Sequence, residues 1–181
     1  MAIRPKFTRA DVQKRLDAFL AMVKKKQIDR MQRLGEMCLI EARLNGSYMD
    51  RTGNLRSSVG YCVFVDGVAV LTKGFDTVTV EAKTIYETRK RKRKDGSVVS
   101  YMAKVKIGGS GVNGTKAGQA LAEKVGKNTK GVALVVVAGM NYAAYVEAKG
   151  YNVLSSAEHL AQRELPRMLE KLISNIKAVA E

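Results

Sequence analysis

The chain has no tryptophan, one histidine and two cysteines among its 181 residues. Aromatic residues make up only 6% of the sequence, so the core must rest mainly on aliphatic side chains. No run of about 18 or more apolar residues occurs, which argues against a membrane-spanning helix and a membrane partner. The N-terminal residues carry charges without an apolar stretch behind them, so the sequence predicts no secretory signal.

The scarcity of reactive side chains also argues against an enzyme. The single histidine, His159, falls in the first turn of a predicted helix, where a surface residue is the simplest interpretation. Cys38 and Cys62 have no ligand residues near them, so we expect buried free thiols instead of a disulfide or a metal site. The glycine-rich residues 109–116 superficially resemble a phosphate loop, but the lysine comes one residue late and Ala117 replaces the Mg²⁺-binding hydroxyl. We expect no catalytic residue, no cofactor and no metal.

What the sequence does have is positive charge, with a formal net charge of +15. The charge is regional, because residues 83–130 carry 13 Lys or Arg against 3 Asp or Glu. Residues 1–45 carry 11 basic against 5 acidic residues, whereas residues 139–181 are balanced at 5 each. An excess of this kind indicates an anionic partner for the central segment and the N-terminal helix.

Residues 8–44 predict one long helix, begun by a capping box at Thr8 and Asp11 and ended by an Asn-Gly pair. Its apolar stripe slips by one residue at Ile28, which indicates either a bend or a helix whose halves face different partners. A short helix is predicted at residues 142–149. A last helix at residues 156–180 would open with a capping box at Ser155 and Glu158. It would kink or restart near Leu165, because Pro166 lies inside its apolar stripe.

Strands are predicted from alternating or continuous β-branched and aromatic residues. The first two form a hairpin around Asp66-Gly67, and two later strands join around Asp95-Gly96. The glycine-rich residues 108–130 predict a flexible loop around a short helix-like stretch. The predicted strands are residues 59–65, 68–71, 78–80, 83–89, 98–107 and 132–138.

These elements predict a single α+β domain over residues 1–181. The long N-terminal helix and the C-terminal helix would pack on a mixed or antiparallel β-sheet. Residues 83–130 would form a long, basic, glycine-rich hairpin or loop insertion.

Six consecutive cations at the centre of this insertion form the most unusual short segment. Packed together they repel one another, so the segment becomes favourable only beside an anionic partner. That partner could be nucleic-acid phosphate, bound with salt-dependent affinity, or an acidic protein surface. The candidate contact residues are Arg89, Lys90, Arg91, Lys92, Arg93 and Lys94.

Two short motifs flank the insertion. Residues 51–58, between the long helix and the first strand, read Arg-Thr-Gly-Asn-Leu-Arg-Ser-Ser and predict a tight turn with one apolar side chain. Residues 141–147 read Asn-Tyr-Ala-Ala-Tyr-Val-Glu, and their aromatic spacing fits one face of a helix. Each motif alone is explained by core packing.

In this order, the two motifs resemble those of the tail-completion, or head–tail joining, neck proteins of long-tailed bacteriophages, of the lambda minor tail protein Z type. The family pattern is "TGxLRxS" followed by "YAxYVExG", between a long N-terminal helix and a C-terminal helix. The residues that carry it are Thr52, Gly53, Leu55, Arg56 and Ser58, then Tyr142, Ala143, Tyr145, Val146, Glu147 and Gly150.

The resemblance implies a structural virion protein, made in the host cytoplasm, that acts without catalysis. Such subunits form a homo-oligomeric ring, commonly sixfold, that joins the portal and head-completion stack to the tail tube or tail terminator. Repeated heterologous contacts would close the ring. DNA passing through the neck is a further partner of the basic segment. A basic nucleic-acid-binding protein remains the alternative function.

Overall fold

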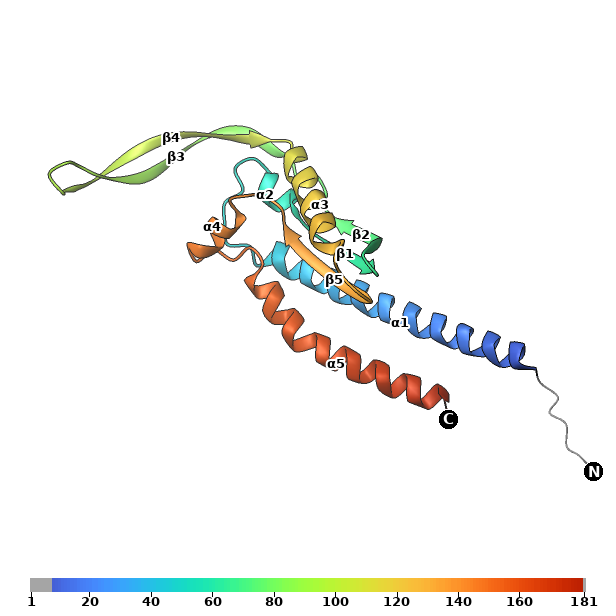
Figure 1. The fold of residues 1–181 in the computed structure, drawn as a ribbon. Coiled ribbons are helices and arrows are strands. Elements are labelled where there is room, and N and C mark those ends of the chain that lie inside the picture. Colours follow the sequence, from blue (N-terminus) through green and yellow to red (C-terminus); the bar gives the residue numbers. More distant parts are fainter. Residues whose placement is uncertain (1–7, 181) are drawn as a thin grey trace, which may run out of the picture.

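The computed structural model describes residues 8–180 of the chain, in which helices and antiparallel strands build an α+β fold (Figure 1). Both sheets of the described part are antiparallel throughout, so the predicted fold class is confirmed. The elements in chain order are α1 (Arg9–Leu44), α2 (Asn54–Ser57), β1 (Val59–Val65), β2 (Val68–Gly74), β3 (Val80–Lys92), β4 (Val98–Gly109), α3 (Val112–Gly126), β5 (Val132–Ala138), α4 (Ala143–Ala148) and α5 (Ser155–Ala180).

The body of the protein is built on a three-stranded sheet in the order β2-β1-β5. Every residue of the central strand β1 is buried, because helices cover both of its faces. Tyr61 and Val63 point to the core shared with α1 and α5, and Cys62 and Phe64 to the core shared with α3. The predicted two-residue turn between β1 and β2 is confirmed, with positive φ angles at Asp66 and Gly67.

Helices α1 and α5 cover one face of the sheet. All the buried residues of α1 lie in its second half, from Leu34 to Ala42. The first half extends past the sheet (Figure 1), so the slip in the apolar stripe at Ile28 separates an exposed half from a packed half. The predicted capping box is confirmed, because Thr8 Oγ1 accepts from the Asp11 N–H while Asp11 Oδ2 accepts from the Thr8 N–H.

Helix α3 covers the opposite face of the sheet, where the sequence predicted a flexible loop over residues 108–130. That prediction is wrong, because residues 112–126 form a regular helix packed on β1 and β5. Small residues at every fourth position of α3 are buried and allow close approach to the sheet. They are Gly114, Gly118, Ala122 and Gly126.

Strands β3 and β4 form a separate two-stranded sheet, a long hairpin that we call the arm. The predicted turn around Asp95-Gly96 is confirmed, although β3 runs from Val80 to Lys92 and is longer than predicted. The strand predicted at residues 78–80 is wrong except for Val80, because the chain between β2 and β3 is irregular.

Helix α5 runs without a break from Ser155 to Ala180, so the restart predicted near Pro166 does not occur. Proline has no N–H, which leaves the carbonyl of Gln162 without its usual helical donor. The predicted capping box at Ser155 and Glu158 is also wrong. The helix start is held instead by Glu147 of α4, as described below.

Candidate docking site

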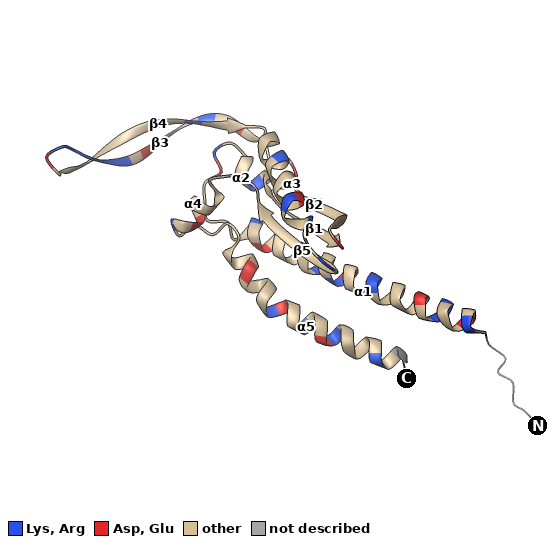
Figure 2. Cartoon of the chain, in the orientation of Figure 1, with Lys and Arg blue, Asp and Glu red and all other residues tan. Residues whose placement is uncertain are grey.

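The arm carries the six predicted cations. Arg89 to Lys92 lie at the end of β3, and Arg93 and Lys94 lie in the connection to β4. The arm points away from the body, and Lys and Arg are found on both of its strands (Figure 2). Strand β3 has 13 residues. At about 3.4 Å per residue it reaches about 44 Å, which exceeds the diameter of a small domain. The run therefore lies on a projecting element.

The base of the arm is fixed to the body by the turn that precedes α2. Both carboxylate oxygens of Glu87 in β3 accept from the Arg51 guanidinium at 2.7 Å. The Gly108 N–H in β4 donates to the Arg51 carbonyl at 2.8 Å. A Cβ added at Gly109 would lie 2.5 Å from the Thr52 carbonyl oxygen, so the two backbones are in close contact.

The first motif, residues 51–58, forms this turn and the short helix α2. Gly53 has φ +76°, and a Cβ there would lie 1.9 Å from the Val78 carbonyl oxygen, so a side chain is excluded. Asp50 Oδ2 accepts from the Arg56 N–H at 2.8 Å, and Thr52 Oγ1 accepts from the Asn54 N–H at 3.4 Å. The predicted tight turn is confirmed.

Leu55 and Ser58 of the first motif are buried. Leu55 packs with Tyr48, Ala143 and Val153, which brings both motifs into one cluster. Ser58 Oγ donates to the Leu55 carbonyl at 2.7 Å, so this buried hydroxyl is satisfied.

The second motif divides between the core and the surface. Ala143 is buried and Val146 packs against the same cluster as Leu55. Tyr142 and Tyr145 are exposed, with the Lys149 ammonium 4.6 Å from the centre of the Tyr145 ring. Gly150 ends the segment at φ +84°, a backbone conformation that favours glycine.

Glu147 holds the start of α5. Its Oε2 accepts from the N–H groups of Val153 and Leu154 at 3.2 and 2.9 Å. Its Oε1 accepts from the N–H of Ser155 at 3.0 Å and from the hydroxyl of the same residue. Burial alone would raise the pKa of Glu147, but the Ser155 hydroxyl and these N–H donors outweigh it, and the pKa lies below its usual range.

Replacing Glu147 with glutamine is therefore expected to lower the free energy of unfolding by about 1–2 kcal/mol at pH 7, since several donors lose a charged acceptor. A depressed pKa in the folded state contributes stability above the unfolded value of about 4.3, and this is lost as the pH falls through the folded pKa. Urea titrations at pH 7 and at a pH below the folded pKa of Glu147 should show that the difference in the free energy of unfolding between variant and wild type narrows in acid.

Glu158→Gln is the matched control for Glu147→Gln, because Glu158 is an exposed carboxylate in the first turn of the same helix. This control should change stability by less than about 0.5 kcal/mol. Equal losses in the two variants would contradict the assignment of the helix cap to Glu147.

A tyrosine-lined groove of about 980 Å³ lies between the two motifs and the base of the arm. Tyr145 and Tyr151 are exposed along it, and Glu87 and Thr88 of β3 form part of its wall. Tyrosine and arginine are enriched in protein interfaces, so the groove and the arm have the composition of a docking surface. The lining includes Tyr48, Asp50, Arg51, Thr52, Tyr142, Tyr145, Val146, Lys149 and Tyr151.

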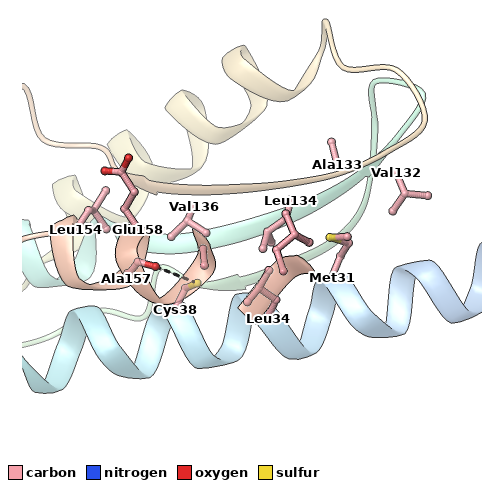
Figure 3. A pocket seen from close by; sticks show the side chains of 12 residues that line it. Met31, Leu34, Cys38, Val132, Ala133, Leu134, Val136, Leu154, Ala157 and Glu158 are labelled. Atoms are coloured by element: carbon pink, nitrogen blue, oxygen red, sulfur yellow. Dashed lines mark hydrogen bonds between the residues drawn. The ribbon is translucent and has the colours of Figure 1, made fainter. Parts of the chain in front are cut away.

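A second hollow, of about 540 Å³, lies between α1, β5 and α5 (Figure 3). Leu34, Leu134 and Val136 point into it, and the Cys38 thiol donates to the Ala157 carbonyl at 3.6 Å. Apart from Cys38 and Glu158, its lining is apolar. Both cysteines are buried free thiols, as predicted.

The glycine-rich segment that resembles a phosphate loop is filled by protein groups. The Gly114 N–H donates to Asn54 Oδ1 at 3.2 Å, and a Cβ at Gly114 would lie 1.9 Å from the Asn54 carbonyl oxygen. A phosphate would need that N–H and that space. His159 is exposed on α5. Within residues 8–180, no three His, Cys, Asp or Glu side chains gather as metal ligands.

Sequence reasoning missed three residues that assemble this site. Asp50 and Asn54 use their side chains to hold α2 and α3, and Arg51 anchors the arm. Asp and Asn next to a Thr-Gly pair are a signal for side-chain capping of a turn. Nothing local in the sequence pairs Arg51 with Glu87.

Each helix in the part of the chain that the structure describes is too short or too polar to cross a bilayer. Comparisons with protein-family models, with curated proteins and with solved structures found no match for this chain.

Proposed function

We propose that this protein is a structural subunit that acts by docking onto neighbouring chains, without catalysis. The observation that carries the proposal is that two elements project from opposite sides of the body (Figure 1), the arm and the first half of α1. The docking role requires only surface complementarity, and both projecting elements leave apolar side chains uncovered.

The first half of α1 is the clearer of the two surfaces. Val12, Leu16 and Leu20 follow one another at four-residue spacing on one helix face, and each is about half exposed at 50%, 49% and 55%. An apolar helix stripe normally packs against another element. A second copy of the chain is the occupant that we propose.

The arm is the second surface. The exposed tyrosines of the chain gather on the arm and along the groove at its base, namely Tyr86, Tyr101, Tyr142, Tyr145 and Tyr151. A projecting arm that reaches over an adjacent subunit gives a heterologous contact, and repetition of such a contact closes a ring.

From the resemblance of the two motifs we propose that this ring belongs to the neck of a long-tailed bacteriophage, commonly with sixfold symmetry. There it would join the portal and head-completion stack to the tail tube or tail terminator. The motif residues support such a role as scaffold, because Leu55 and Ala143 pack in one buried cluster and Glu147 holds the start of α5. A second candidate function is nucleic-acid binding, which the cationic arm favours.

Replacing Leu16 with glutamine is expected to weaken self-association by about tenfold or more, since burial of one leucine contributes about 1.5–3 kcal/mol. Sedimentation velocity over a range of concentrations measures the effect. Lys14→Gln, at an exposed position two residues away and so on the opposite side of the helix, is the control and should leave self-association unchanged within about twofold. Equal behaviour of the two variants would contradict the role of the stripe.

A further inference from the structure

The arm has two chemically different faces. Successive residues of a strand point to opposite faces, so the register of β3 with β4 separates even-numbered from odd-numbered residues. The odd-numbered face turns toward the body, because it holds Glu87, bonded to Arg51, and the buried Ile107. We call the even-numbered residues 84–92 and 98–106 the outward face. Every residue of the outward face is exposed.

The outward face carries only positive charge. Lys90 and Lys92 lie on β3, and Lys104 and Lys106 on β4, while no carboxylate shares this face. Lysines two residues apart on one strand are separated by about 7 Å along the arm, so they repel one another. Glu87 is the carboxylate of the paired segments, and it lies on the other face, bonded to Arg51. The repulsion on the outward face is relieved only by an external anion.

The chemistry of this face favours nucleic acid over an acidic protein. Its cations are all lysines, and lysine is depleted in protein–protein interfaces. Thr84 and Ser100 lie on the same face as the lysines and supply hydroxyl donors of the kind that contact phosphate oxygens. A two-stranded ribbon also fits the major groove of B-DNA, about 12 Å wide.

We propose that the outward face of the arm binds the phosphate backbone of a nucleic-acid duplex. The lysines neutralise phosphates, which releases counterions and makes the affinity fall steeply with salt. The face lacks Asn, Gln and Arg, which read base edges by bidentate contacts, and its lysines are assigned to phosphates, so we expect binding that is independent of sequence. This proposal does not depend on ring formation, because a single arm carries the whole face.

The test compares two triple variants of the full chain that each remove three positive charges. Lys90→Gln, Lys104→Gln and Lys106→Gln change the outward face, and Lys83→Gln, Arg89→Gln and Arg91→Gln change the other face of the same strands. Fluorescence anisotropy with a labelled duplex of about 30 base pairs gives the affinity between about 50 and 300 mM salt. A third variant places arginine at Lys90, Lys104 and Lys106.

The outward-face variant should bind at least about 30-fold more weakly than wild type at about 100 mM salt, with a log–log salt slope reduced by about 3. The control triple should lose less than about fivefold, and the arginine variant should bind like wild type. Equal losses in the two glutamine variants would overturn the proposal. So would failure of wild type to bind the duplex, or tighter binding to a polyglutamate probe than to DNA.

Discussion

Replacing Tyr61 with alanine is expected to lower the free energy of unfolding by about 3–5 kcal/mol. Tyr61 is fully buried at the centre of β1. Its ring fills the space opposite Gly35 of α1, where an added Cβ would lie 2.4 Å from the ring. Alanine would leave a cavity between the sheet and the helix, and the surrounding strands could collapse into it only in part.

The variant Tyr61→Phe separates the contribution of the ring to stability from that of the hydroxyl. The Tyr61 hydroxyl donates to Glu36 Oε1 at 2.9 Å, and Lys73 donates to the same oxygen at 3.1 Å. Because Lys73 still donates to the Glu36 carboxylate, Tyr61→Phe should lower the free energy of unfolding by only about 1 kcal/mol. Chemical denaturation measures both variants. A loss in Tyr61→Ala no greater than that in Tyr61→Phe would contradict the packing of α1 on the sheet.

Replacing Gly118 with alanine is expected to destabilise the protein by about 1–3 kcal/mol, although alanine is the better helix former by about 1 kcal/mol. The reason is the close approach of α3 to the sheet. A Cβ at Gly118 would lie 2.5 Å from the Ser58 carbonyl oxygen and 2.5 Å from the Phe75 ring. The Ser58 carbonyl also accepts from the Gly139 N–H at 3.1 Å, so it cannot move away freely.

The sign of this effect makes the Gly118 variant informative. If residues 112–126 were a loose loop or an exposed helix, alanine would stabilise the chain or leave it unchanged. Gln119→Ala, at the exposed neighbouring position, is the control and should stay within about 0.5 kcal/mol of wild type. Thermal and urea unfolding of both variants distinguish the two cases, and a more stable Gly118→Ala would contradict the packing of α3.

The parts of the fold that the sequence predicted are those whose signals are local. The cap of α1 depends on Thr8 and Asp11, three residues apart, and the β1–β2 turn on Asp66-Gly67. The arm followed from alternation on both sides of Asp95-Gly96. Each of these signals is complete within a few residues.

The full extent and regularity of helix α3 were missed, although a short helix-like stretch was predicted within it, because glycine lowers helix propensity and the segment holds glycines at the positions that face the sheet. Their four-residue spacing was the available signal, since it puts Gly114, Gly118, Ala122 and Gly126 on one face. The cap of α5 was missed for a different reason. Ser155 and Glu158 fit the local pattern, but the tertiary structure brings Glu147 to the same N–H groups.

The sequence predicted which residues belong to the candidate site, but only part of how these residues are arranged in space. Both motifs were identified from the sequence. Each contributes to core packing, which was the simplest interpretation of either motif alone. Their meeting through Leu55 and Ala143 depends on long-range packing. The sidedness of the arm could not be predicted either, because the register of β3 with β4 decides which lysines share a face.

The proposed docking role has a physical basis in the uneven distribution of the core. Burial is concentrated on β1, the second half of α1 and α3, while the arm and the first half of α1 keep apolar side chains in solvent. Contacts with other chains would bury these surfaces and add stability that the single chain does not have. Assembly and phosphate binding are compatible, because assembly would use the α1 stripe, the groove and the face of the arm that holds Tyr101, whereas phosphate binding would use the lysines of the outward face.

The measurement that tests this account most directly is negative-stain imaging of the full-length protein, concentrated to about 100 µM before dilution, with sedimentation on the same sample. The account predicts closed ring-shaped particles of uniform diameter, which Leu16→Gln reduces and Lys14→Gln leaves intact. A protein that stays monomeric at every concentration, with both variants indistinguishable from wild type, would contradict the proposal that it acts by docking onto copies of itself.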